Sequence, residues 1–371
     1  MPMKQEQEDA RTEVTEVGRG VLRMELPISM PGLGHVNCYA LLDDEGATIV
    51  DPGLPGNATW KALKERLAQA DLEPRHVHTI IVTHSHPDHF GCASRFQREA
   101  GSKLIAHSRF GADWGHGHAH DHPEASVDDL TAQADAKRAA ALDRDPDADA
   151  KAAEKAMKSR WDQPAPWGGT PPRPPMKYRM RRRFAGLMNR DEFMPNVTDP
   201  VDHGDVLRLA GRDWFVHHTP GHTMDHFCLH DPEAGIFLSG DHVLPSITPH
   251  ISGMTPDQDP LQCFFTALDQ VAEIPDVKDV LPAHGHPFQE LDGRAQAIKR
   301  HHRERLERIK EISAEIGGPG TVEAFSEKLF KPRSWGSMAQ SETYAHLEHL
   351  RLLDEAECYR DEDGQLRYQT R

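Results

Sequence analysis

Residues 80–89 read IIVTHSHPDH and place four potential metal ligands directly after a short apolar run. The ligand-type side chains belong to His84, His86, Asp88 and His89. The apolar run predicts a buried strand, and the loop at the carboxyl end of such a strand is the usual position of a site in α/β folds. Imidazole and carboxylate are ligands that zinc and similar divalent metals prefer. The stretch therefore predicts a metal site at one edge of a sheet.

The same arrangement recurs four times along the chain. Each of the apolar runs 47–50, 214–216, 236–238 and 280–281 leads within a few residues into a His or an Asp. A glycine often stands beside that residue and lets the backbone turn tightly. Core packing does not account for five such coincidences, so we expect these strand ends to form one site. The side chains concerned are those of Asp51, His222, Asp241 and His284.

The order Asp, HxHxDH, His, Asp and His resembles the five motifs of the metallo-β-lactamase superfamily, over about 20–110 and 196–288. The resemblance implies an α/β fold of the αββα sandwich type with two metal ions at its active site. It also implies a role for each motif residue: His84, His86 and His222 hold the first metal; Asp88, His89 and His284 hold the second; Asp241 bridges the two; and Asp51 supports the HxHxDH loop from behind the ligands.

The chemistry that this resemblance implies is hydrolysis. Two divalent ions lower the pKa of a shared water, so that a metal-bridging hydroxide is present at neutral pH and attacks an acyl or phosphoryl centre. Zinc is the first choice, and iron or manganese are alternatives for the same ligands. Asp88, a carboxylate beside the nucleophile, is our candidate catalytic residue for proton transfer.

The domain organisation follows from changes in composition. We expect a polar N-terminal segment over 1–18, a catalytic domain over 19–289 with a helical insertion at about 111–195, and a small C-terminal domain over 290–371. The last segment predicts three helices, the second over Thr321–Phe330 and the third over Glu342–Leu353, and a hairpin turning at Glu362–Gly364. This pattern resembles the winged-helix module that follows the fold in a subgroup with an endoribonuclease-like relative.

The substrate expected first is a small-molecule thioester of the acyl-CoA or glutathione type, and a lactone or carboxylic ester comes next. Asp241 stands where the secreted two-metal β-lactamases carry a cysteine, and it resembles the pattern of glyoxalase II.

Lys177 and Arg179, in the basic run KYRMRRR, are candidates for contacting phosphates of a coenzyme A ester. The alternative is that these basic residues simply form a solvent-exposed helix face, and we favour this alternative slightly over contact with substrate. His250 is a further substrate candidate, and the insertion is a candidate lid.

The alternative enzyme class is a phosphodiesterase or endoribonuclease of the same fold. The net charge of −16 opposes nucleic-acid binding, and residues 290–371 carry 14 Lys and Arg against 16 Asp and Glu. We therefore expect this module to pack or to form a homodimer. The non-enzyme alternative is a redox protein similar to the flavodiiron relatives of this fold. Those relatives replace some His ligands with carboxylates and carry a flavin domain. We expect neither feature in this sequence, so this alternative ranks last.

The remaining composition points to the reducing interior of the cell. The five cysteines are scattered, with no CxxC pair. No apolar run approaches the ~20 residues of a membrane span. The N-terminus MPMKQEQEDARTEV has no apolar core, so we expect no secretory signal, no membrane association and a cytoplasmic location.

Overall fold

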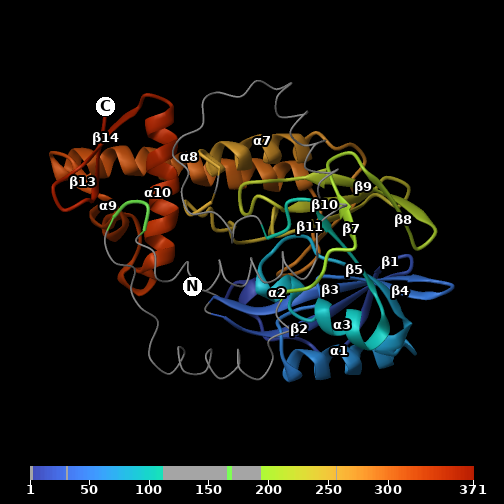
Figure 1. Cartoon of the computed structure of the whole chain (residues 1–371). Helices are drawn as coiled ribbons and strands as arrows, with labels where there is room; N and C mark the ends of the chain where they lie inside the picture. The colour runs from blue at the N-terminus through green and yellow to red at the C-terminus, as the bar shows by residue number, and fades with distance from the viewer. Residues whose placement is uncertain (1–2, 31, 112–164, 169–193, 256) are drawn as a thin grey trace.

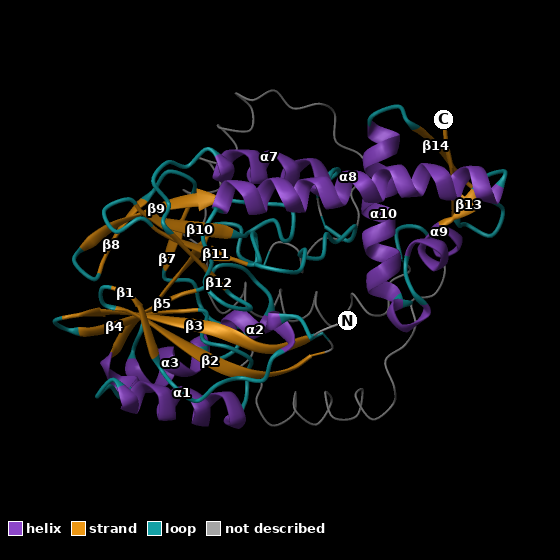
Figure 2. Ribbon diagram, turned by 180° about the vertical axis from the view of Figure 1, so that it is seen from behind, coloured by secondary structure: helices purple, strands orange, loops and turns teal. Residues whose placement is uncertain are grey.

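The computed structural model describes residues 3–30, 32–111, 165–168, 194–255 and 257–371. Within them two mixed sheets pack face to face, and helices cover the outer face of each sheet (Figures 1 and 2). This is the predicted αββα sandwich.

The first sheet has the strand order β1-β2-β3-β4-β5-β6-β7. Strands β1 to β4 pair antiparallel, and β4 to β7 pair parallel. The helices α1 and α3 cover its outer face (Figure 2). The elements of this half are η1 (Gln5–Gln7), β1 (Thr15–Gly18), β2 (Val21–Met30), β3 (Leu33–Asp43), β4 (Gly46–Val50), α1 (Asn57–Gln69), η2 (Pro74–His76), β5 (Val77–Ile81), α2 (Pro87–Phe90), α3 (Ala93–Ala100), β6 (Lys103–His107) and β7 (Asp199–Val201).

The second sheet has the order β12-β11-β10-β9-β8, with only the β11–β12 pair parallel. The helices α7 and α8 cover its outer face (Figure 1). Apolar side chains from both sheets, Trp214 and Tyr39 among them, form the core between the sheets. The elements of this half are β8 (Val206–Leu209), β9 (Arg212–His218), β10 (Phe227–Asp231), β11 (Ile236–Gly240), α7 (Pro260–Ala272), β12 (Asp279–Pro282) and α8 (Leu291–Ile316).

The C-terminal part contains the three predicted helices and the predicted hairpin. A short third strand, β13, pairs with the hairpin strand β15. The elements after α8 are β13 (Gly320–Thr321), α9 (Val322–Leu329), η4 (Pro332–Ser334), α10 (Ser337–Leu352), β14 (Ala356–Arg360) and β15 (Leu366–Thr370). The identity of this module as a winged helix stays a prediction.

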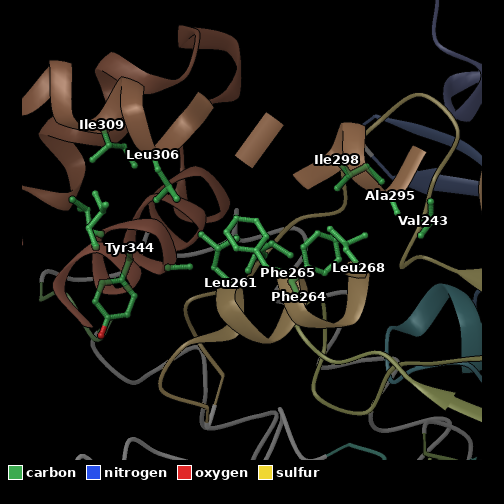
Figure 3. Packing of buried hydrophobic residues seen from close by; sticks show 14 of the residues in the cluster. Val243, Leu261, Phe264, Phe265, Leu268, Ala295, Ile298, Leu306, Ile309 and Tyr344 are labelled. Atoms are coloured by element: carbon green, nitrogen blue, oxygen red, sulfur yellow. The ribbon is translucent and has the colours of Figure 1, made fainter. Parts of the chain in front are cut away.

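The long helix α8 connects this module to the second sheet. Its first turns bury Ala295 and Ile298 beside α7, and its later turns bury Leu306 and Ile309 near α10 (Figure 3). The same apolar cluster includes Trp167, from within the predicted insertion. A single core thus continues across the predicted boundary between residues 289 and 290. The division into separate domains stays a prediction.

Candidate metal centre

The strand ends of both sheets bring the motif residues together. Asp51 follows β4, the HxHxDH loop follows β5, and His284 follows β12. His222 lies in the loop after β9, and Asp241 comes directly after β11. Each ligand thereby lies in a loop or short helix that begins within a few residues of the end of a core strand.

Two groups of ligand atoms result, each within 4.8 Å. The first group contains His84, His86, His222 and Asp241. In it, Nδ1 of His86 lies 3.0 Å from Nε2 of His84 and 3.1 Å from Nε2 of His222. The carboxylate of Asp241 completes the group, with Oδ2 3.5 Å from Nε2 of His222.

The second group contains Asp88, His89 and His284. Oδ2 of Asp88 lies 3.6 Å from Nε2 of His89 and 3.5 Å from Nε2 of His284. Asp241 also reaches this group, because its Oδ1 lies 3.4 Å from Nε2 of His284. Its carboxylate therefore lies between the two groups, the position that the resemblance implies for a bridging ligand.

The outer nitrogen of four histidines is held by a hydrogen bond, which fixes the orientation of each ring. In each case Nδ1 makes this bond and Nε2 is left for the centre. The Nδ1 acceptors are Thr83 Oγ1 for His84 at 3.0 Å, Asp51 Oδ2 for His89 at 2.9 Å, the backbone oxygen of His250 for His222 at 2.7 Å, and the backbone oxygen of His35 for His284 at 2.7 Å.

Three atoms at the centre are buried without a hydrogen-bond partner: Nε2 of His89, Nε2 of His284 and Oδ1 of Asp241. A buried polar atom left without a partner costs about 1–3 kcal/mol, so such atoms are rare unless something binds them. Two ring nitrogens and a carboxylate oxygen are the donor set of a divalent metal. The residues present therefore fit the metal ions that the motifs imply.

The protonation of the first group also suits metal binding. Burial lowers the pKa of His84 and of His86 well below the ordinary value, and the neighbouring imidazoles lower it further. Both rings are neutral at pH 7. Neutral imidazole is the form that binds a metal.

The second group holds an excess of negative charge. Burial acts to lower the pKa of His89, but the surrounding carboxylates, Asp88 foremost, raise it well above the ordinary value. For Asp241, burial acts to raise the pKa, but His284 and His89 hold it well below. In the metal-free chain these carboxylates favour the protonated form of His89. A divalent ion bound there would displace that proton.

Asp51 supports the loop that carries the ligands. Its carboxylate accepts hydrogen bonds from the backbone N–H and the hydroxyl of Thr83, both at 2.9 Å, and from His89. Its backbone has φ of 54°, a conformation that Asp tolerates better than most residues. The structure thus places Asp51 behind the ligands, as the resemblance implies.

Four further histidines near the motifs take different positions. His226 accepts the backbone N–H of Asp241 at 3.0 Å, and thereby orients the bridging residue. His286 turns away from the ligands and lies 3.1 Å from Glu8. His242 is fully buried. His250 lies partly exposed beside Glu342 of α10, at 3.3 Å.

The N-terminal segment packs against the loops of the centre. Glu6 is fully buried, and its carboxylate accepts the backbone N–H groups of Ser246 and Ile247 at 2.7 and 3.1 Å. Gln5 accepts the N–H of His286 at 2.7 Å. Lys177 and Arg179 lie outside the described residues, as does nearly all of the insertion proposed as a lid.

Apart from Asp51, sequence reasoning missed the groups that orient the ligands. The carbonyls of His35 and His250 give no sequence signal, because every residue has a carbonyl. Glu6 and Glu342 lie far from the motifs along the chain. Thr83 could have been found, since it precedes His84 at the end of the strand.

The fold and the ligand arrangement define a metal-dependent hydrolase, and comparison with known sequences gives the family. The Metallo-beta-lactamase superfamily matches residues 31–316. The chain belongs to this superfamily. Among the part of the chain that the structure describes, no helix has the length and apolarity needed to cross a membrane.

A solved structure and two curated proteins are similar to this chain. A metallo-beta-lactamase family protein of Thermus thermophilus is 26% identical with a TM-score of 0.66, covering 96% of this chain and 100% of that one. A hydroxyacylglutathione hydrolase of Maricaulis maris is 32% identical over 24% of this chain and 34% of its own length. An atrochrysone carboxyl ACP thioesterase of Cryptosporiopsis is 30% identical over 33% of this chain and 38% of its own. The chain spans about a third of the length of these curated relatives.

Proposed function

We propose that this protein hydrolyses thioesters, of the acyl-CoA or glutathione type first, with lactones and carboxylic esters as secondary substrates. The observation that carries the proposal is the carboxylate of Asp241 between two groups of buried His and Asp ligands. The names of two partial relatives, a hydroxyacylglutathione hydrolase and an acyl carrier protein thioesterase, support the same bond type.

Two divalent ions, when bound, would supply Lewis acidity and an ionised water at neutral pH. His84, His86 and His222 would hold one ion, and Asp88, His89 and His284 the other, with Asp241 shared. Zinc is the first choice for this donor set.

The protein's own residues would position this chemistry. We assign proton transfer to Asp88, which is 3% exposed and lies between the rings of His89 and His284. Its carboxylate would take the proton of the attacking water and return one to the leaving thiolate. The attack of water on the acyl carbon breaks the carbon–sulfur bond and gives a carboxylic acid and a thiol.

The test is hydrolysis by the metal-loaded protein of a panel containing an acyl-CoA, a glutathione thioester, a lactone, a p-nitrophenyl ester and bis-p-nitrophenyl phosphate. His84→Ala and Asp241→Ala are measured beside the wild type. His286→Ala is the matched control, because this histidine follows the same strand as His284 but faces Glu8.

Thioester turnover that disappears in the two ligand variants and persists in the control is the expected result. Preferential cleavage of the phosphodiester would contradict the proposal and assign the protein to the nuclease class. Bound metal with no turnover of any acyl substrate would also contradict it.

A further inference from the structure

The stretch that carries His284 belongs to the second sheet but is held by the first. It begins at the last residue of β12, and three of its carbonyl groups accept hydrogen bonds from Asn37 of β3. The backbone N–H of Asn37 donates to Ala283 at 2.7 Å. Its amide Nδ2 donates to Pro282 and to Gly285, both at 2.8 Å. The three carbonyls lie on either side of His284 along the chain, so Asn37 holds the backbone of this ligand from both ends.

Arg23 of β2 completes the attachment. Its Nε donates to Oδ1 of Asn37 at 2.9 Å, and its Nη2 donates to the backbone oxygen of Gly285 at 2.8 Å. The same Nη2 lies 2.8 Å from Oε1 of Glu25, whose charge compensates that of the guanidinium. All three side chains are buried. A buried polar network is stable only when its hydrogen bonds are satisfied, so these bonds fix one arrangement of the strand and the attached stretch.

The pleat of the first sheet explains why these polar groups meet the second sheet. In the β2–β3 pair, Glu25 lies opposite Asn37, and Arg23 lies opposite Tyr39. Residues opposite each other, and residues two apart on one strand, point to the same face of a sheet. The hydroxyl of Tyr39 on this face donates to Pro282 at 2.7 Å, and its ring packs in the core between the sheets. The face that carries Arg23 and Asn37 is therefore turned toward the end of β12.

This attachment bears on one of the two groups of ligand atoms. His284 belongs to the second group and not to the first. The other members of the second group, Asp88 and His89, lie in α2, which follows β5 of the first sheet. The second group is therefore assembled from both sheets, with Nε2 of His284 3.5 Å from Oδ2 of Asp88. This geometry depends on how firmly residues 282–285 are joined to the first sheet.

We propose that Arg23 and Asn37 are positioning residues that selectively set the affinity of the second ligand group for its metal ion. The pair holds His284 within reach of Asp88 and His89, while the first group has no member in the stretch that the pair holds. The inference rests on the metal chemistry of the proposed function. It is tested through metal binding, which does not depend on the substrate.

The test compares Arg23→Met with Arg66→Met. Arg66 is the matched control, because it is 4% exposed against 6% for Arg23 and also donates to two backbone oxygens. These acceptors are Glu25 at 3.1 Å and Arg11 at 2.8 Å, so Arg66 supports the first sheet and the segment before it instead of the stretch at His284.

Two further variants separate the amide from its surroundings. Asn37→Leu removes the donors at similar volume, and Tyr39→Phe removes one bond to an oxygen that Asn37 also binds. Each protein is stripped of metal and titrated with zinc against a chelator of known affinity, which suppresses weak binding by surface histidines. The Tm of each metal-free protein reports its stability.

The wild type should bind two ions. Arg23→Met and Asn37→Leu should weaken the binding of one ion about 10- to 100-fold and leave the other near the wild-type affinity. Arg66→Met should lower the Tm of the metal-free protein about as much as Arg23→Met does, yet bind both ions normally, as should Tyr39→Phe. His284→Ala identifies the ion concerned, because adding Arg23→Met to it should cause no further loss of affinity.

Wild-type affinity for both ions in Arg23→Met or in Asn37→Leu would overturn the inference. An equal loss in Arg66→Met, or an equal weakening of both ions, would overturn it too, because the effect would then follow from stability alone. These outcomes leave the proposed thioester hydrolysis standing. Conversely, a wild type that binds two ions and cleaves no acyl substrate would contradict the proposed function alone, and a wild type that binds no zinc would contradict both.

Discussion

Asp51 accepts a hydrogen bond from Nδ1 of His89 at 2.9 Å, and both side chains are almost completely buried. The pair links the end of β4 to the HxHxDH loop after β5. Asp51 belongs to neither group of ligand atoms and still controls where Nε2 of His89 lies. Ligand geometry in this protein therefore depends on residues outside the two ligand groups.

Asp51→Asn should weaken metal binding about 10- to 100-fold, because the amide removes the charge that holds His89 and its loop. Asn tolerates the left-handed backbone of this position, so the change tests the side chain alone. The measurement is competition for zinc with a chelator of known affinity.

The matched control is Asp43→Asn. Asp43 likewise accepts two hydrogen bonds, from the backbone N–H groups of Glu45 and Gly46 at 2.9 and 3.0 Å, and it lies 3.1 Å from a ring nitrogen of His78, but it is the last residue of β3 and lies outside the centre. Equal metal affinity of the two variants would contradict the role given to Asp51.

Gly240→Ala should destabilise the protein and disturb the bridging residue. Gly240 has φ of 51°, and an added Cβ would lie 2.5 Å from Nε2 of His226, which accepts the N–H of Asp241. Gly211→Ala is the control, with φ of 73° and no atom within 4 Å of an added Cβ.

Placing an alanine at a positive φ costs about 1–2 kcal/mol of stability, and this cost should appear in both variants. Urea unfolding should give a larger loss of stability for Gly240→Ala, accompanied by a loss of bound metal. Similar stabilities and metal contents in the two variants would show that the contact with His226 does not matter.

The stability of the fold should fall as the pH drops from about 6.5 toward 4. Burial, aided by His230 and His203, lowers the pKa of His217 from 6.5 to about 4. Since the folded pKa lies below the unfolded one, the unfolded chain binds more protons in this window. The stability that depends on neutral His217 is fully present above pH 6.5, and it is lost as the pH falls from 6.5 toward 4.

His217→Phe should reduce this acid sensitivity, because Nε2 of His217 is buried without a partner and the ring packs near Phe237. The measurement is the Tm between pH 7.5 and 4.5 for both proteins. A drop in Tm as steep in the variant as in the wild type would rule out a contribution from His217.

Glu6→Ala should destabilise the loop at residues 244–247. The substitution leaves the N–H groups of Ser246 and Ile247 without their acceptor, at a cost of about 2 kcal/mol. Urea unfolding measures the change. Glu13→Ala, an exposed glutamate of the same segment, is the control and should stay within about 0.5 kcal/mol of the wild type. Comparable losses in both would mean that the N-terminal segment does not anchor this loop.

The sequence predicts the ligand-bearing strand ends well, because each ligand follows an apolar run within a few residues. The strands at 47–50, 80–82, 214–216, 236–238 and 280–281 all appear within a residue or a few of their predicted bounds. The αββα class, by contrast, is what the resemblance of these motifs to the metallo-β-lactamase superfamily implies. Local signals suffice here, since a buried strand and the turn after it are encoded side by side.

Contacts between distant segments give no such signal. Helix α10 begins at Ser337, five residues before the predicted Glu342, since its first turn buries only the small Ala339, leaves Met338 exposed and shows no apolar period. Strand β13 has two residues and exists only because β15 pairs with it. The link from Glu342 to His250 spans 92 positions and depends on how α8 positions the module.

The metal content of the protein tests the central claim most directly. The protein, stripped with a chelator and reconstituted with zinc, should bind two ions per chain by mass spectrometry of its metals. Asp241→Ala should lose at least one of them, because its carboxylate reaches both ligand groups. A wild type that binds no zinc, or an Asp241→Ala variant that retains two ions, would contradict a dinuclear centre bridged by Asp241.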